Sequence, residues 1–393
     1  MTSATILPTV SSRLARPVPP SDARFRYVAI RRLLSSTDYS GLYTYTCQSA
    51  ECAMTKVVTG HDVARLAGVS QATVSRAIRN LPGTAPETRA AVLAAAAELD
   101  YLPSDSGRVL STRSTRRVAV VVEEMTNPFY PELIEPLQQA LLTRGLRTVL
   151  VSDRGEGEPR AQLPQLADGS YDGVVLTTTI RGSRLPRDLS ERGIPHVLMN
   201  RVLDHAESPG CTFDNTSGAA QVAQLLVDLG HESIAAIHGP ITTSTGSERA
   251  ASLRAALRSL GAPLKRTRTR RAPVFSHDAG YNLARDLLTG PDRPTAIACG
   301  NDVLAMGALS AARSLNIAVP ADLTVIGYDD IALSSWPFVN LTTVRCDLPV
   351  LAAETVAMLM RALGGERFAE IQRIPVALVR RGSHRRLGEG RSE

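Results

Sequence analysis

The chain has 393 residues, 44% of them apolar, which is long enough for several hydrophobic cores and therefore for several domains. Its net charge is +6, but only Lys56 and Lys265 are lysines, and this arginine bias reflects genomic base composition as much as function. The charge alone is therefore weak evidence for a nucleic-acid partner. No stretch approaches the roughly 20 apolar residues of a membrane span or forms the core of a signal peptide, so we expect a soluble, cytoplasmic protein without a membrane partner.

The cysteines do not form a metal site or a disulfide pattern. Two of the five are separated by four residues near the N-terminus, but no second pair completes a zinc motif. We expect unpaired thiols in a reducing compartment, with no metal and no cofactor. The five cysteines are Cys47, Cys52, Cys211, Cys299 and Cys346.

Residues 1–53 are rich in Ser, Thr, Pro and Arg and show no sustained period of 3.6 or 2. This composition is typical of disorder. We therefore interpret this region as a disordered extension rather than as a domain.

Residues 59–80 read TGHDVARLAGVSQATVSRAIRN and predict two short helices around a tight turn. Ala64 is small enough for a close helix crossing, and Gly68 suits the positive φ of the turn. Ser70 can cap the second helix. A third helix is predicted over residues 86–99, beginning with a proline and carrying an apolar stripe. This is a helix-turn-helix pattern.

With the following ETRAAVLAAAAELDYLPS and a long alternating α/β region, the chain resembles the lac-repressor (LacI-type) transcription factors. The resemblance implies a three-helix DNA-binding domain over residues 54–102 and a hinge over 103–116. We expect Gln71 and Ala72 to contact base edges, Arg76 to read guanine, and the remaining residues to hold or face the phosphate backbone. Those remaining residues are Lys56, Ser70, Thr73, Ser75 and Arg79.

The hinge of this family folds on DNA and inserts a leucine into the minor groove, and Leu110 is the matching residue. The match is imperfect, because Asp105 adds a negative charge and Gly107 weakens a helix by about 1 kcal/mol relative to alanine. A plain flexible linker over 103–116 is the alternative.

From residue 118 onward, short apolar runs alternate with amphipathic helical segments, which predicts parallel sheets covered on both faces. The predicted strands are 118–122, 148–151, 174–176, 196–199, 234–237, 296–299 and 323–326, and the predicted helices are 131–143, 216–229, 248–260, 279–288 and 301–315. The resemblance implies two doubly wound subdomains of the periplasmic-binding-protein-like type I fold within 117–393. Subdomain one would cover about 117–214 and 344–373, and subdomain two about 215–343 and 374–393.

Ligands of such sheets bind beyond the carboxyl ends of the strands, so we expect a cleft between the subdomains. The resemblance places Asn127, Arg249, Phe275, Asn301 and Asp329 at ligand-binding positions of the family, where they would offer amides, charges and an aromatic face to a sugar ring. Each could instead serve as a turn, cap or core residue. The resemblance adds Phe129, Tyr130, Asn200, Arg201, Phe213 and Cys346 to the expected ligand-binding set.

We therefore predict a sequence-specific transcriptional regulator, in most such proteins a repressor, that binds operator DNA as a homodimer under the control of a small molecule such as a sugar. The alternative is a solute-binding receptor of the same core fold without a DNA role. An enzyme is not expected, because no P-loop, G-x-G-x-x-G or G-x-S-x-G motif occurs. His61, His231, His238 and His277 are expected to be surface or capping residues.

Met54 is followed directly by TKVVTGHDVARLAG, the usual beginning of members of this family. Residues 1–53 are therefore either an artefact of an upstream start or a real regulatory or DNA-contacting arm. We expect a protein beginning at Met54 to keep its affinity for operator DNA nearly unchanged in a fluorescence-anisotropy titration. A large loss of affinity would instead show that residues 1–53 contribute to DNA binding.

Overall fold

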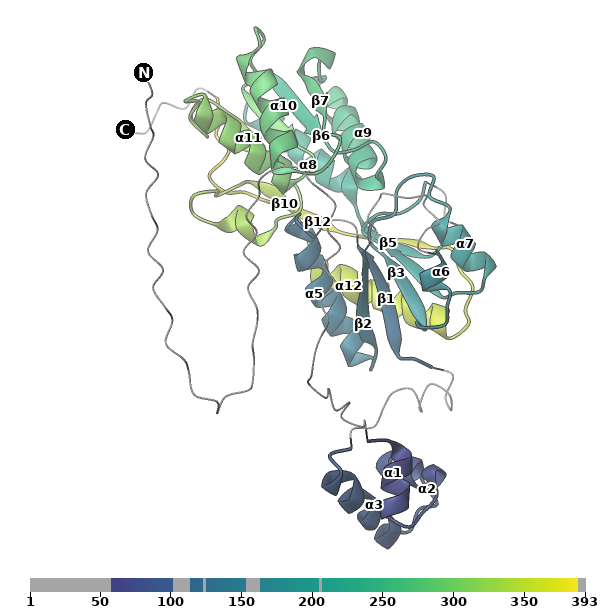
Figure 1. The fold of residues 1–393 in the computed structure, drawn as a ribbon. Helices are drawn as coiled ribbons and strands as arrows, with labels where there is room; N and C mark the ends of the chain where they lie inside the picture. Colours follow the sequence, from purple (N-terminus) through teal and green to yellow (C-terminus); the bar gives the residue numbers. More distant parts are fainter. Residues whose placement is uncertain (1–57, 102–113, 123–124, 153–162, 205–206, 388–393) are drawn as a thin grey trace, which may run out of the picture. The chain divides into compact units, whose positions relative to one another are not determined.

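The computed structural model describes residues 58–101, 114–122, 125–152, 163–204 and 207–387 (Figure 1). The chain divides into two compact units, Met1–Tyr101 and Leu102–Glu393, and each is described by itself. Of the predicted DNA-contacting residues, Lys56 and Leu110 lie outside the described ranges, as do residues 1–53. Within those ranges, no helix is both long and apolar enough to span a bilayer.

Residues 58–101, the described part of the first unit, form three helices, α1 (Gly60–Leu66), α2 (Gln71–Ile78) and α3 (Pro86–Glu98). Gly68 takes a φ of +67° in the turn between α1 and α2, where a side chain would be strained. The Ser70 hydroxyl caps α2 by accepting from the Thr73 N–H at 3.1 Å. The three helices bury a small core of Val63, Ala64, Val74, Ala77, Val92 and Ala95.

The second unit contains two parallel sheets, each with helices on both faces (Figure 1). The first sheet has the strand order β11-β5-β4-β3-β1-β2. Along β1, Val118, Val120 and Val122 pack against one hydrophobic core and Ala119 and Val121 against another, as expected for a strand buried on both sides. Its strands are β1 (Arg117–Val122), β2 (Arg147–Ser152), β3 (Gly173–Leu176), β4 (His196–Met199), β5 (Gly210–Phe213) and β11 (Ile371–Ile374).

Helices α5 (Phe129–Thr143) and α12 (Leu348–Leu363) pack together on one face of this sheet. The short helices α6 (Leu163–Leu166) and α7 (Leu185–Glu191) cover the other face, where Leu163, Leu166, Leu185 and Leu189 are buried. Strands β1, β3 and β4 therefore lie between two apolar layers, which explains their largely apolar sequences, whereas the edge strands β2 and β11 are partly exposed.

The second sheet has the order β7-β6-β8-β9, with β7 (Thr269–Arg271), β6 (Ile234–His238), β8 (Ala296–Cys299) and β9 (Thr324–Ile326). Helices α8 (Asn215–Asp228) and α9 (Ser244–Ser259) share one core with it, and α10 (His277–Thr289) and α11 (Asp302–Ser314) share the other. Two 3-10 turns, η1 (Arg266–Arg268) and η2 (Ala332–Ser335), complete this half of the unit.

The chain passes between the two sheets three times. It leaves the first sheet after β5 into α8, returns after β9 through β10 (Thr343–Cys346) into α12, and leaves again from β11 into β12 (Val376–Val379). Strands β10 and β12 pair antiparallel with each other. The two halves are therefore tied by three segments, and residues at the carboxyl ends of both sheets are brought to one place.

The predicted strands and helices correspond to observed ones within a few residues, but the observed elements that were not predicted include strands β5, β7, β10 and β11 and helices α6, α7 and α12. Strands β5 and β7 are short, at four and three residues, and β7 reads Thr-Arg-Arg without an apolar side chain. Such a segment gives no periodic signal, because its pairing with β6 depends on a neighbour distant in sequence.

Candidate functional site

The outer face of α2 presents most of the predicted DNA-contacting side chains. Gln71, Ala72, Arg76 and Arg79 are exposed, while Thr73 and Ser75 are half-buried. The Arg79 guanidinium donates through Nε to the Ser75 carbonyl at 3.1 Å and also contacts the Ser75 hydroxyl. This face can offer an amide, a methyl group and two guanidiniums to a DNA groove.

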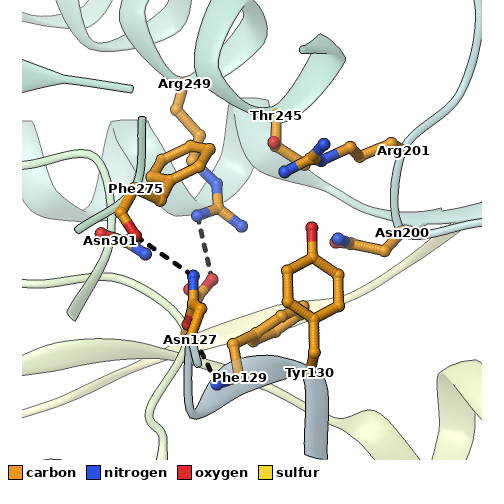
Figure 2. A pocket seen from close by; sticks show the side chains of 10 residues that line it. Asn127, Phe129, Tyr130, Asn200, Arg201, Thr245, Arg249, Phe275 and Asn301 are labelled. Atoms are coloured by element: carbon orange, nitrogen blue, oxygen red, sulfur yellow. Dashed lines mark hydrogen bonds and ion pairs between the residues drawn. The ribbon is translucent and has the colours of Figure 1, made fainter. Parts of the chain in front are cut away.

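A second site is a pocket of about 290 Å³ in the second unit, lined by residues that follow strand ends of both sheets (Figure 2). Asn127, Phe129 and Tyr130 follow β1, and Asn200 and Arg201 follow β4. From the other sheet come Thr245 and Arg249 on α9 after β6, Phe275 after β7, Asn301 after β8 and Asp329 after β9.

A buried ion pair forms the polar wall of this pocket. Arg249 Nη1 lies 2.9 Å from Asp329 Oδ1, and both side chains are only 6% exposed. Arg249 also donates through Nε to Asn215 Oδ1 and through Nη1 to the Gly300 carbonyl, each at 2.9 Å. Its guanidinium lies 3.7 Å from the centre of the Tyr328 ring. Burial raises the pKa of Asp329 to about 6, although Arg249 opposes the shift.

One acceptor oxygen of the pocket, Asn200 Oδ1, is buried without accepting a hydrogen bond, whereas Asp329 Oδ1 is paired with the Arg249 guanidinium. A buried acceptor left in this way is costly, and at a binding site it indicates a donor supplied by a ligand. Both residues also have left-handed backbones, with φ of +69° for Asn200 and +115° for Asp329. Strained conformations of this kind concentrate at functional sites.

Aromatic rings form the apolar walls of the pocket. Phe129 and Tyr130 meet edge to face with their centroids 5.7 Å apart, and the Arg201 guanidinium lies 5.9 Å from the Tyr130 ring centre. Phe275 comes from the opposite side, and its ring packs so closely on Gly239 that a Cβ there would lie 2.2 Å from it. Figure 2 shows Phe275 and the Phe129–Tyr130 pair facing the same space from different elements.

Nine of the eleven predicted ligand-binding residues line this pocket, and two do not. Phe213 is fully buried in the core at the end of β5, and Cys346 is 5% exposed within β10. Thr245 lines the pocket and was not predicted. It precedes Arg249 by four residues and so shares its helix face, a spacing from which it could have been found.

Behind the pocket, a second carboxylate holds the segment that carries Asp329. Asp302 is fully buried and accepts hydrogen bonds from the Ile331 N–H at 3.0 Å, the Ser334 hydroxyl at 2.6 Å and the Thr343 hydroxyl at 2.5 Å. Burial raises its pKa to about 7, with a further contribution from the charge of Asp329. Asp302 therefore joins α11, η2 and β10 around the pocket wall.

The expected surface position is wrong for two of the four histidines. His231 and His238 are each 3% exposed, and the His231 ring lies within hydrogen-bonding distance of the Thr295 and Thr324 hydroxyls. Burial lowers the pKa of both rings to about 4, so they are neutral near pH 7. No group of three or more His, Cys, Asp or Glu side chains placed to hold a metal occurs among the described residues.

Comparison with known families matches two parts of the chain. Residues 59–104 match the family "Bacterial regulatory proteins, lacI family", and residues 223–384 match "Periplasmic binding protein-like domain". The HTH-type transcriptional repressor PurR of Pectobacterium carotovorum subsp. carotovorum (strain PC1) is 32% identical over 314 residues, which are 79% of this chain and 92% of that protein. The HTH-type transcriptional regulator CelR of Thermobifida fusca is 34% identical over 311 residues, 77% of this chain and 91% of that protein.

Solved structures show the same architecture. The transcriptional regulator CelR-cellobiose complex is 31% identical, with a TM-score of 0.64 over 83% of this chain and 99% of that one. The lac repressor dimer bound to operator and the anti-inducer ONPF has a TM-score of 0.74 at 24% identity, over 84% of this chain and 100% of that one. The second similarity is one of fold.

The buried carboxyl of Asp302 contributes stability that is lost as the pH rises from about 4 to 7. With its pKa raised to about 7, the folded protein keeps a proton that the unfolded chain, with a carboxyl near its ordinary 3.8, has already released. One such group gives a slope of at most about 1.4 kcal/mol per pH unit. Guanidinium unfolding across this range should show the wild type losing stability relative to Asp302→Asn with up to this slope, because the contributions of Asp329, His231 and His238 are present in both proteins.

The control is Asp278→Asn, which changes a carboxyl that is 93% exposed on α10. It should keep the wild-type slope. If Asp302→Asn also kept that slope, the proton would reside on another group.

Proposed function

Because the chain belongs to the LacI family of bacterial regulatory proteins, we propose that the pocket around Arg249 and Asp329 binds a neutral sugar and that this ligand changes the affinity of the protein for operator DNA. The protein is a DNA-binding transcriptional regulator with a small-molecule-binding core and is not an enzyme. A solute-binding receptor without a DNA role is excluded, because the helix-turn-helix domain is part of the chain. We further propose that it acts in the cytoplasm as a homodimer on a pseudo-palindromic operator.

The chemistry of the pocket supports a sugar. A sugar ring carries hydroxyl donors around its edge and C–H groups on its faces, and the pocket offers the acceptors Asn200 Oδ1 and Asp329 Oδ1 together with the rings of Phe275 and Phe129. The relative CelR was solved with cellobiose. The unsatisfied buried acceptor Asn200 Oδ1, in a pocket that also presents the Arg249–Asp329 pair and aromatic rings, is the observation that carries the proposal.

The size of the pocket limits the ligand. Its 290 Å³ of space between the lining atoms is partly open to solvent, and only about 20 Å³ of it can hold the centre of a water-sized sphere. In this closed arrangement the pocket therefore has no room for a long oligosaccharide.

Contacts across the cleft give the ligand a means of control. The Arg181 N–H donates to the Thr242 carbonyl at 2.7 Å, and the Val202 N–H donates to the Ser244 hydroxyl at 3.0 Å. Asn127 Nδ2 donates to the Phe275 carbonyl at 3.4 Å. A ligand that touches both halves stabilises this closed arrangement over an open one, and only such differential affinity can shift DNA binding.

For the DNA-binding unit, we propose base contacts from Gln71, Ala72 and Arg76 and backbone contacts from the other exposed or half-buried polar residues of α2. Gln71, Ala72 and Arg76 lie on the exposed face of α2, whose N-terminus enters the major groove in helix-turn-helix proteins. The backbone set comprises Ser70, Thr73, Ser75 and Arg79, with Lys56 and Leu110 proposed from sequence alone.

The ligand proposal is tested by thermal unfolding of the full chain with cellobiose and a panel of other sugars, polyols and nucleosides. A ligand at a hundredfold excess over its dissociation constant stabilises the folded state by about 2.7 kcal/mol. We expect a stereospecific shift with a sugar, lost in Arg249→Ala while DNA binding persists. Arg254→Ala, which changes an exposed arginine on the same helix, is the control and should respond as the wild type does. A normal response of Arg249→Ala, or shifts with nucleosides alone, would contradict the proposal.

The DNA contacts are tested by comparing two arginines of α2. Arg76→Ala should lose about 1–3 kcal/mol of discrimination between selected and scrambled DNA, because a guanidinium reading guanine contributes specificity. Arg79→Ala should weaken both affinities alike and reduce the salt dependence, as expected for a phosphate contact. Anisotropy titrations at several salt concentrations measure both effects, and equal behaviour of the two variants would refute the assignment.

A further inference from the structure

The segment Ser114–Arg116, here called the hinge exit, joins the predicted hinge to β1 of the core. It is the last part of residues 103–116 and directly precedes Arg117, where β1 begins. It lies at the amino end of β1, and the pocket residues follow the carboxyl ends of the strands. Its contacts are therefore independent of the ligand pocket.

The carboxylate of Asp172 holds the hinge exit with four hydrogen bonds. Oδ2 accepts from the Ser114 hydroxyl at 2.6 Å and from the Arg116 N–H at 2.9 Å. Oδ1 accepts from the Thr115 N–H at 2.6 Å and from the Thr115 hydroxyl at 2.7 Å. Each oxygen thus serves two donors, and three successive residues are bound by one side chain.

These bonds keep the carboxyl charged. Partial burial raises the pKa of Asp172, but the donors on Ser114, Thr115 and Arg116 outweigh it, so the pKa lies below the ordinary value. Charge-assisted hydrogen bonds are stronger than neutral ones. The anchor is therefore formed at neutral pH.

The hinge exit is also bent and held from its other side. Arg116 has a φ of +52°, a left-handed conformation that a side chain disfavours. Its carbonyl accepts from the Arg147 N–H of β2 at 2.7 Å, and the Thr115 hydroxyl accepts from the Arg117 N–H at 3.1 Å. A bend that costs energy persists only where neighbouring contacts determine it.

Asp172 is itself part of the rigid sheet. It directly precedes β3, which lies beside β1 with Gly173 opposite Val118, and its N–H donates to the Arg117 carbonyl at 2.8 Å. The direction in which the chain leaves the core is therefore set by a residue of the sheet rather than by the hinge alone.

We propose that Asp172 is a positioning residue for operator binding, which fixes the hinge exit so that the DNA-binding units of a dimer are presented at the separation that the operator requires. Specific binding needs both units in register with two half-sites, whereas nonspecific binding depends on charge and tolerates variable placement. Loss of the anchor should therefore reduce specific affinity and leave nonspecific affinity unchanged. The inference does not depend on which ligand the pocket binds.

The test uses full-length protein, a duplex that the wild type selects from a random library, and a scrambled duplex of the same composition. Asp172→Asn and Asp172→Ala should each bind the selected duplex about tenfold more weakly, since partners of a charged group are lost, with unchanged affinity for the scrambled duplex. Asp168→Asn is the matched control, because this neighbouring exposed carboxylate bonds to Ser170 within its own loop and not to the hinge exit. It should bind both duplexes as the wild type does.

A double-mutant cycle with Thr115→Val tests whether Asp172 acts through the hinge exit. The single variants should each lose affinity for the selected duplex, and the double variant should lose no more than Asp172→Asn alone. Thermal unfolding of the variants within a few degrees of wild type shows that the core is intact. Wild-type affinity of both Asp172 variants, equal losses on both duplexes, or additive losses in the cycle would each overturn the proposal.

Discussion

The buried ion pair of Arg249 and Asp329 is the interaction around which the ligand pocket is built. An arginine and an aspartate that are each 6% exposed are tolerated only because other groups complete their hydrogen bonding. Asn215, Gly300 and the Tyr328 ring surround the guanidinium, and they come from α8, the end of β8 and the end of β9. The Arg249–Asp329 ion pair thus connects helix α8 with the ends of strands β8 and β9 at one wall of the pocket.

The pocket exists because two parallel sheets end at the same place. Parallel strands present their carboxyl ends at one edge, and the three crossing segments bring the edges of the two sheets together (Figure 1). Asp302 reinforces this arrangement by bonding residues of η2 and β10, the segment that returns to the first sheet. Asp302 therefore supports both the wall of the ligand pocket and a segment that connects the two halves. Such an arrangement suits a protein that is regulated by closure of the cleft.

Strand β3 runs from the hinge exit at one end of the first sheet to the cleft at the other. Asp172 precedes it and holds the hinge exit, while Thr177 follows it and donates through its hydroxyl to the Val121 carbonyl at 2.7 Å. The next loop reaches the cleft, where Arg201 contacts the Thr178 carbonyl and the Arg181 N–H bonds to Thr242 of the other half. A four-residue strand, roughly 13 Å long at about 3.3 Å per residue, separates the cleft rim from the hinge exit.

The sequence by itself determined the helix-turn-helix and the doubly wound class, because these depend on local patterns such as Gly68 at a turn and short apolar strands, and its resemblance to a known family indicated most pocket residues. Only the tertiary structure decided which polar groups meet. Asp302 falls in the first turn of the helix predicted over 301–315 yet bonds to Ser334 and Thr343, and Asp172 bonds to residues more than fifty positions earlier. Phe213 and Cys346 lie in the core and not on the pocket lining for the same reason. Burial and hydrogen-bond partners across distant segments are set by how the sheets pack, and no local period of the sequence encodes that.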